Sequence, residues 1–130
     1  MEPVFETKGT CLYIRLPAEL DHPASDLIRR ESEQIMGKKY IRTICFDFRD
    51  TTFMDSSGIG LIMGRYRALG MRSGCIQARN VSRYIEKLLR LSGVSRFLEV
   101  LGGDEAGEDG EAQEKTPCRA GFRDEERRRV

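Results

Sequence analysis

The chain has 130 residues, which suggests one domain large enough to bury a core without disulfide or metal staples. Its 22 Lys and Arg residues nearly balance 21 Asp and Glu residues, so no strong overall field favours nucleic acid. Residues 102–130 carry nine acidic and six basic side chains, which leaves 16 basic and 12 acidic side chains in residues 1–101. These basic residues form no stripe suited to duplex binding, so we expect no direct nucleic-acid partner.

The four cysteines provide no metal site that the sequence can identify. No pair has C-x-x-C spacing, and His22 is distant from all of them, so we expect no metal and no cofactor. Cys11, Cys45 and Cys75 fall in or beside expected strands, where Cys is usually a small core residue. The sequence contains neither a signal-peptide pattern nor an apolar run near 18 residues. We therefore expect a reduced, cytoplasmic protein without a membrane partner.

The first half of the chain predicts a hairpin followed by a helix. Residues 4–7 and 10–16 have strand patterns, and the Lys8-Gly9 link between them favours an antiparallel pair. Residues 17–23 are expected to form a loop. Pro23 suits the first turn of the helix that follows, and Gly37 is expected to end that helix.

The central stretch predicts a buried strand that leads into a helix. Residues 41–48 are almost all β-branched, aromatic or small and apolar, as in a strand buried on both faces. After a polar turn come Asp55-Ser56-Ser57-Gly58 and then an amphipathic helical period, whose apolar positions are Ile59, Ile62, Tyr66 and Leu69.

The third part predicts a strand at 75–78, a helix after the candidate caps Asn80 and Ser82, and a last strand at 96–101. Strands that alternate with helices indicate a single α/β domain with a mixed, mostly parallel sheet, an N-terminal antiparallel hairpin and helices packed against it. We expect this domain to cover residues 1–101. Residues 102–130 have few large apolar residues and predict a disordered, charged tail.

Two serines lie where the buried strand gives way to the helix. The first backbone N–H groups of a helix lack internal partners, and the helix dipole adds partial positive charge there. This position suits either a serine cap or a phosphate, and physical chemistry alone leaves both open. Gly58 and Gly60 would let another surface approach the backbone closely.

Four segments of the chain form a recognisable set. They are Glu19-Leu20-Asp21-His22, Phe53-Met54-Asp55-Ser56-Ser57-Gly58-Ile59-Gly60, Gly64-Arg65-Tyr66 and Leu91-Ser92-Gly93. Together they resemble the STAS-domain family, and more narrowly the anti-sigma factor antagonists of sporulating Firmicutes. The resemblance covers about residues 3–101. It implies the STAS fold and a binding protein rather than an enzyme.

The resemblance also implies a switch. Ser56 would be the phosphoacceptor of an anti-sigma factor serine kinase, which the unphosphorylated form binds so that the sporulation sigma factor is released. A separate serine phosphatase would reset Ser56. The same resemblance implies a partner surface composed of Asp21, Asp55, Ser56, Ser57, Gly58 and Arg65.

Alternatives remain for individual residues and for the whole chain. Ser57 and Asp55 suit a plain cap or turn, and Arg65 suits a solvated helix face. The glycine spacing from Gly58 to Gly64 is G-x-G-x-x-x-G, which does not fit the dinucleotide fingerprint. A general-stress antagonist or a transporter-associated STAS subunit is the alternative function. The chain also departs from the family at Ala18, where Gly is usual, and after residue 101, where a fourth amphipathic helix is usual.

Overall fold

The computed structural model describes residues 2–101, which form a five-stranded sheet, a two-stranded sheet and three α-helices. The large sheet has the order β1-β2-β4-β6-β7. Its strands are β1 (Val4–Lys8), β2 (Cys11–Arg15), β4 (Thr43–Asp47), β6 (Ile76–Arg79) and β7 (Glu99–Val100). The small sheet pairs β3 (Glu19–Leu20) with β5 (Phe53–Met54). The helices are α1 (His22–Lys38), α2 (Ser56–Ala68), α3 (Arg83–Leu91) and the 3-10 helix η1 (Val94–Phe97).

The sheet is mixed, as the sequence predicts. β1 and β2 form an antiparallel hairpin, and the pairs β2–β4, β4–β6 and β6–β7 are parallel. Every residue of β4 is buried, which confirms the prediction of a strand covered on both faces. The α/β fold class is therefore confirmed.

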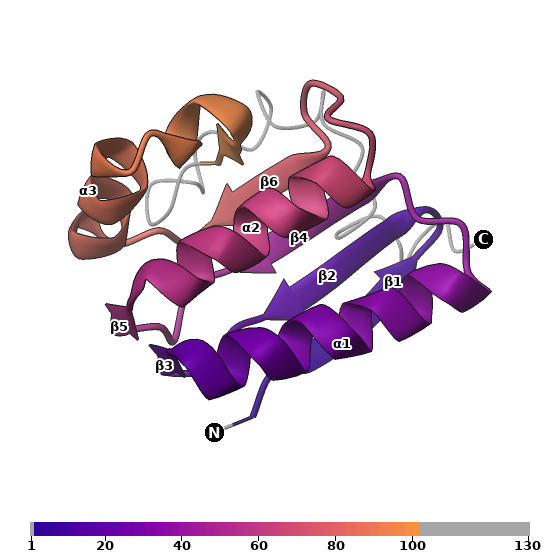
Figure 1. The fold of residues 1–130 in the computed structure, drawn as a ribbon, viewed down its shortest axis with the longest axis horizontal. Coiled ribbons are helices and arrows are strands. Elements are labelled where there is room, and N and C mark those ends of the chain that lie inside the picture. Colours follow the sequence, from indigo (N-terminus) through magenta and orange to yellow (C-terminus); the bar gives the residue numbers. More distant parts are fainter. Residues whose placement is uncertain (1, 102–130) are drawn as a thin grey trace.

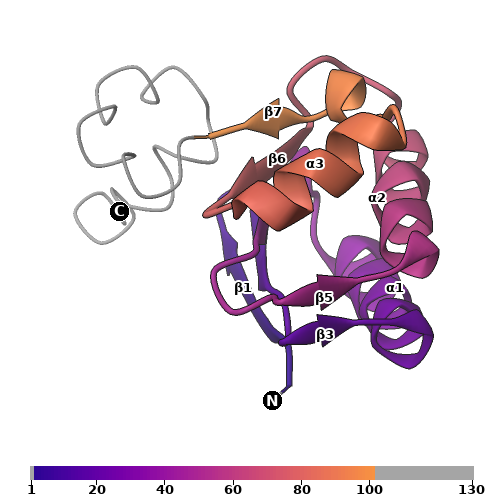
Figure 2. The same cartoon turned by 90° about the vertical axis from the view of Figure 1, so that its left-hand side faces the viewer.

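The helices pack on one side of the large sheet. Figure 1 shows α1 and α2 lying side by side over the sheet, roughly along its strands, and Figure 2 shows the sheet edge-on with the helices on one side of it. The main core lies between the sheet and the helices. It contains Ile14 and Phe46 of the sheet, Ile28 of α1, Ile62 of α2 and Ile85 of α3. Among residues 2–101 no helix is both long and apolar enough to span a membrane.

The structure differs from the sequence predictions at short elements. The expected loop at 17–23 contains β3, and the expected strand at 96–101 is only β7, because η1 takes up the residues before it. Two-residue strands are too short to carry a hydrophobic period. Gly37 does not end α1, which runs on to Lys38, and the Lys39 N–H still donates to the Ile35 carbonyl. The expected tail at 102–130 and a fourth helix lie outside the described residues.

The small sheet joins two distant parts of the chain. β3 and β5 are parallel, with Leu20 opposite Met54. The backbone N–H groups of Thr52 and Phe53 both donate to the Ala18 carbonyl, and the Thr51 hydroxyl donates to the Pro17 carbonyl at 2.8 Å. Each of these strands leads directly into a helix, so the small sheet brings the start of α1 beside the start of α2 (Figure 1).

Candidate functional site

The candidate site is built from the two helix starts that the small sheet holds together. Asp21 follows Leu20 and caps α1, accepting a hydrogen bond from the Ala24 N–H at 3.2 Å. Asp55 follows Met54 and caps α2. Neighbouring strands lie about 4.8 Å apart, so the two caps that follow paired residues are close neighbours. The positive ends of two helix dipoles and two carboxylates thus meet on one surface.

Asp55 is held in place by the residues that follow it. Its Oδ1 accepts hydrogen bonds from the Ser57 N–H at 2.9 Å and from the Ser57 hydroxyl. The Ser57 hydroxyl, then the N–H groups of Ser57 and Gly58 and the charge of His22, lower the pKa of Asp55 against the opposing effect of burial. Asp55 therefore keeps its negative charge at neutral pH.

Ser56 differs from its neighbour Ser57. Ser56 is the first residue of α2 and is exposed, and its side chain makes no hydrogen bond with the described residues. The Ser57 hydroxyl is half-buried and contacts Asp55 and the Ser25 hydroxyl of α1, the latter at 3.3 Å. Ser56 therefore has the exposed hydroxyl of the two, whereas the Ser57 hydroxyl is held by Asp55 and Ser25.

Gly58 serves internal packing. A Cβ at this position would lie 2.6 Å from the Met54 Cγ and 3.0 Å from the Leu20 Cδ2. The close approach that the sequence predicts at Gly58 is thus made by the two strands beneath the helix. A Cβ on Gly60 would meet nothing within 4 Å, so Gly60 leaves open space at the surface.

Arg65 lies inside the molecule rather than on the partner surface that the sequence predicts. The exposed fraction of its side chain is 5%, and its Nη2 donates to the Glu33 Oε2 of α1 at 3.0 Å. Its Nη1 contacts the Met36 Sδ at 3.7 Å. The interpretation of Arg65 as a solvated helix face is wrong, because the side chain joins α2 to α1.

A groove runs along the surface between α1 and α2, next to the two caps. It has a volume of about 280 Å³ and is lined by His22, Ser25, Asp26, Arg29, Ser57, Gly60 and Leu61. Within α1, Asp26 and Arg29 form an ion pair along one wall. Ser57, the residue after Ser56, belongs to this lining, so the groove adjoins the start of α2.

The comparisons with known proteins agree with this geometry. The model of the STAS domain matches residues 2–103. The chain belongs to the STAS-domain family. It is 32% identical over 89 residues to the anti-sigma F factor antagonist of Paenibacillus polymyxa, a match that covers 68% of this chain and 76% of that protein.

Two solved structures share the STAS fold with this chain. One is the anti-sigma factor antagonist SpoIIAA in its unphosphorylated form, with 33% identity, a TM-score of 0.59 and coverage of 68% of this chain and 82% of that chain. The other is the Bacillus cell fate determinant SpoIIAA in the phosphorylated form, with 31% identity, a TM-score of 0.62 and coverage of 82% and 97%. These structures show that a protein of this fold exists in both states.

The STAS site contains residues that sequence reasoning did not single out. Ser25 is buried and contacts Ser57, and Glu33 binds Arg65. Leu20 and Met54 form the floor beneath Gly58. No pattern in the sequence marks the contacts of Ser25, Glu33 and Leu20, because each joins segments more than 30 residues apart. Among residues 2–101 no group of three or more potential metal ligands occurs.

Proposed function

We propose that this STAS-domain chain is an anti-sigma factor antagonist of the sporulation type. In its unphosphorylated form it binds an anti-sigma factor and so releases the sigma factor. Relatives at 32–35% identity carry the name anti-sigma F factor antagonist, which supports this proposal. The chain acts by binding, not by catalysis, and the function implies a cytoplasmic protein.

We propose Ser56 as the phosphoacceptor. The observation that carries this proposal is the exposed Ser56 hydroxyl in the first turn of α2, beside the cap of α1. The kinase is the anti-sigma factor, and transfer moves the terminal phosphoryl group of ATP to the Ser56 Oγ, with loss of the hydroxyl proton and release of ADP. A serine phosphatase removes the phosphate by hydrolysis.

Phosphate at Ser56 would change the surface without disturbing the fold. It adds about −1.5 to −2 charge next to Asp21 and Asp55. The start of α2 stabilises that charge through its N–H groups and dipole. A partner that fits the surface with only the Asp21 and Asp55 carboxylates binds less well once the phosphate charge is added. The switch therefore acts at the interface. The partner surface comprises Asp21, Asp55, Ser56 and the exposed edge of Ser57, with Gly58 as its packed support.

Phosphorylation of matched variants tests the proposal. The wild-type protein, Ser56→Ala and Ser57→Ala are incubated with the candidate anti-sigma factor and ATP, and intact masses are measured. We expect one phosphate on the wild type and on Ser57→Ala, and none on Ser56→Ala. Phosphate that persists in Ser56→Ala contradicts the site. A wild type that neither binds the anti-sigma factor nor gains phosphate favours another STAS role, as a general-stress antagonist or a transporter subunit.

A further inference from the structure

The loops that follow α1 and α2 form an end of the domain away from Ser56. Both helices start beside the small sheet and run away from it (Figure 1). The Arg72 Nη2 donates to the Arg42 carbonyl at 2.6 Å, so the loop after α2 lies beside the loop after α1. The 17 residues of α1 span about 25 Å, which separates this end from the helix starts that form the candidate site.

Five exposed cations gather at this end of the domain. They are Lys38, Lys39, Arg42, Arg67 and Arg72, and with Tyr40 and Met71 we call them the basic end. None of the five cations forms an ion pair with a carboxylate of residues 2–101. Neither residues 34–46 nor residues 56–85 contain Asp or Glu, and the Glu99 carboxylate, which lies near Gly74, borders this end. Without the five cations, residues 1–101 carry 11 basic and 12 acidic side chains, so the positive excess is concentrated here.

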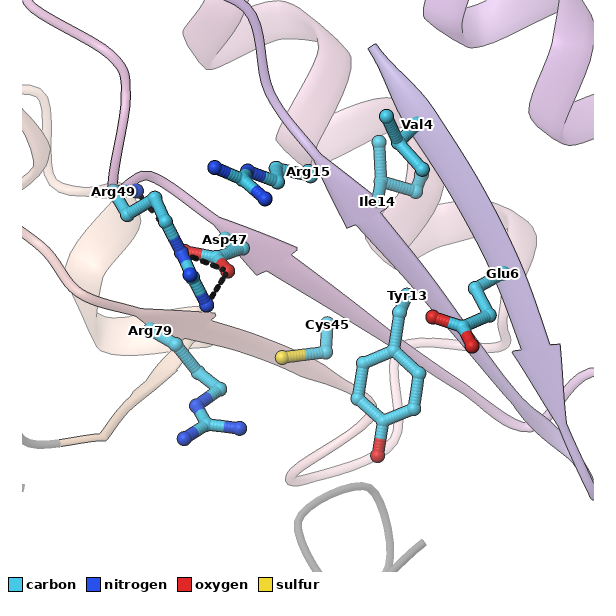
Figure 3. A pocket seen from close by; sticks show the side chains of 9 residues that line it. All are labelled: Val4, Glu6, Tyr13, Ile14, Arg15, Cys45, Asp47, Arg49 and Arg79. Atoms are coloured by element: carbon cyan, nitrogen blue, oxygen red, sulfur yellow. Dashed lines mark hydrogen bonds and ion pairs between the residues drawn. The ribbon is translucent and has the colours of Figure 1, made fainter. Parts of the chain in front are cut away.

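Other arginines of the domain have acidic partners. Arg15 binds Asp50 at 2.7 Å, and Arg49 binds Asp47 at 3.0 Å. Figure 3 shows Arg49 beside Asp47 in a pocket of the domain. The fold therefore neutralises these guanidinium groups, whereas the charges of the basic end remain available to a partner.

Helix dipoles account for part of the basic end. The last turn of a helix favours cations, and Lys38 and Arg67 lie in the last turns of α1 and α2. Arg42 and Arg72 lie beyond the helices, where the effect of the dipole has fallen off. Stabilisation of the helices thus does not explain why the two loops add further positive charge.

Two large apolar side chains project among these cations. The exposed fractions are 74% for Tyr40 and 58% for Met71. The Met71 N–H donates to the Tyr66 carbonyl at 3.0 Å, and the Tyr66 hydroxyl donates to the Met71 carbonyl at 3.2 Å. The backbone at Met71 is therefore held by hydrogen bonds on both sides while its side chain faces solvent.

We propose that the basic end binds the surface of an anionic lipid bilayer. Lys and Arg side chains are attracted to anionic headgroups, and each contributes roughly a fivefold factor in binding. Tyr is enriched at the boundary between headgroups and acyl chains, where Tyr40 and Met71 enter. Attachment is peripheral, because it uses two loops rather than a membrane-spanning helix. The sequence predicts no membrane partner, since a patch assembled from separate loops leaves no apolar run.

This attachment goes beyond the proposed function. A chain bound through the basic end has the starts of α1 and α2 about 25 Å from the lipid, so Ser56 stays open to a partner. Vesicle binding is measured without an anti-sigma factor. Failure of the attachment therefore leaves the Ser56 proposal untouched, and failure of the Ser56 proposal leaves the attachment untouched.

Sedimentation with lipid vesicles tests the attachment on the full chain. One set of vesicles contains phosphatidylglycerol and phosphatidylcholine in equal parts, and the other contains phosphatidylcholine alone. The test variant carries Lys38→Gln, Arg42→Gln and Arg67→Gln, whose native side chains make no hydrogen bond within residues 2–101. The matched control carries Arg83→Gln, Lys87→Gln and Arg90→Gln, which removes the same charge from α3. Circular dichroism checks the fold of each protein.

We expect the wild type and the control to bind the anionic vesicles equally and the neutral vesicles weakly. The test variant should bind the anionic vesicles at least about tenfold more weakly. A wild type that does not sediment with anionic vesicles overturns the proposal, as does an equal loss in the control. A wild type that binds a DNA duplex but not the anionic vesicles assigns the basic end to nucleic acid and also overturns it.

A salt series on the wild type gives a second measurement that does not depend on any variant folding. Raising ionic strength from about 0.1 M to about 1 M shortens the Debye length from about 10 Å to about 3 Å. Binding to the anionic vesicles should therefore weaken steeply. Binding that is unchanged across the series overturns the proposal.

The apolar part of the basic end is tested by Tyr40→Ser combined with Met71→Asn. Asn tolerates the positive φ of 56° at position 71. We expect this variant to bind the anionic vesicles at least about threefold more weakly, because apolar burial in the bilayer is lost while the charge is kept. Wild-type affinity in this variant overturns the insertion of Tyr40 and Met71.

Discussion

Gly58 and Gly60 lie two residues apart on α2, and a side chain would have different surroundings at each. In Gly58→Ala the new Cβ would lie 2.6 Å from the Met54 Cγ, so the buried Met54 side chain must move. We expect a loss of about 1–3 kcal/mol in the free energy of unfolding. Gly60→Ala places its methyl group in open space and favours the helix, so we expect a gain of up to about 1 kcal/mol. Urea denaturation measures both, and equal changes would contradict the packing.

The charge of Asp55 links the stability of the domain to pH. Its pKa is lowered in the folded state, so its carboxylate stabilises the protein at neutral pH and that stabilisation is lost as pH falls through the lowered pKa. Asn still caps a helix, so Asp55→Asn should fold. We expect the wild type to be the more stable of the two at pH 7, and the difference to shrink toward about pH 3.

Urea denaturation at each pH measures that difference. The pKa values of Asp26 and Asp50 are also lowered, by hydrogen bonds from Arg29 and Arg15 respectively. Both groups are present in both proteins, so their contributions cancel in the difference between the two unfolding free energies. A stability difference that stays constant from pH 7 to pH 3 would mean that the charge of Asp55 contributes nothing beyond its capping geometry.

At the scale of elements, Arg65 is the side chain that fixes α2 against α1. Its buried stem and its hydrogen bond to Glu33 are lost together in Arg65→Ala, so we expect a loss of about 1–3 kcal/mol in the free energy of unfolding. Arg67→Ala, two residues along the same helix and exposed, should change it by less than about 0.5 kcal/mol. The folded Arg65→Ala protein should bind the anti-sigma factor with wild-type affinity, and a specific binding defect would return Arg65 to the partner surface.

The elements show where sequence reasoning succeeds. The mostly apolar run at 41–48, which contains β4, and the hairpin of β1 and β2 carry strong local patterns, and both are confirmed. β3, β5 and η1 are too short for any period, so the sequence does not reveal them. Asn80 was a candidate cap, but its φ is 56° and its side chain donates to the Asp47 Oδ1 at 2.8 Å, while Ser82 caps α3.

The same limit applies to the site. The Asp55-Ser56-Ser57-Gly58 motif is contiguous, so the sequence could identify the start of α2 and its cap. The contacts of Ser25 and Glu33 with α2 join residues about 30 positions apart, and no local pattern encodes them. Burial decides the role of Arg65, and a helical period cannot distinguish an arginine on the solvated face from one held between two helices.

At the scale of the whole molecule, a charge added at Ser56 acts on the surface where the starts of α1 and α2 meet. Ser56→Asp adds a negative charge at the start of α2, where the helix dipole favours it, while Asp21 and Asp55 oppose it. These effects offset one another in the fold, so we expect the unfolding free energy to change by less than about 0.5 kcal/mol. A partner that fits the unmodified surface meets the extra charge directly.

We therefore expect Ser56→Asp to weaken binding to the anti-sigma factor at least about tenfold, which corresponds to about 1.4 kcal/mol. Ser56→Asn has a side chain of similar size without the charge and serves as the control, which should bind more tightly than Ser56→Asp. Calorimetric titration measures both affinities. Normal affinity in Ser56→Asp would mean that charge at this position is not what separates the partners.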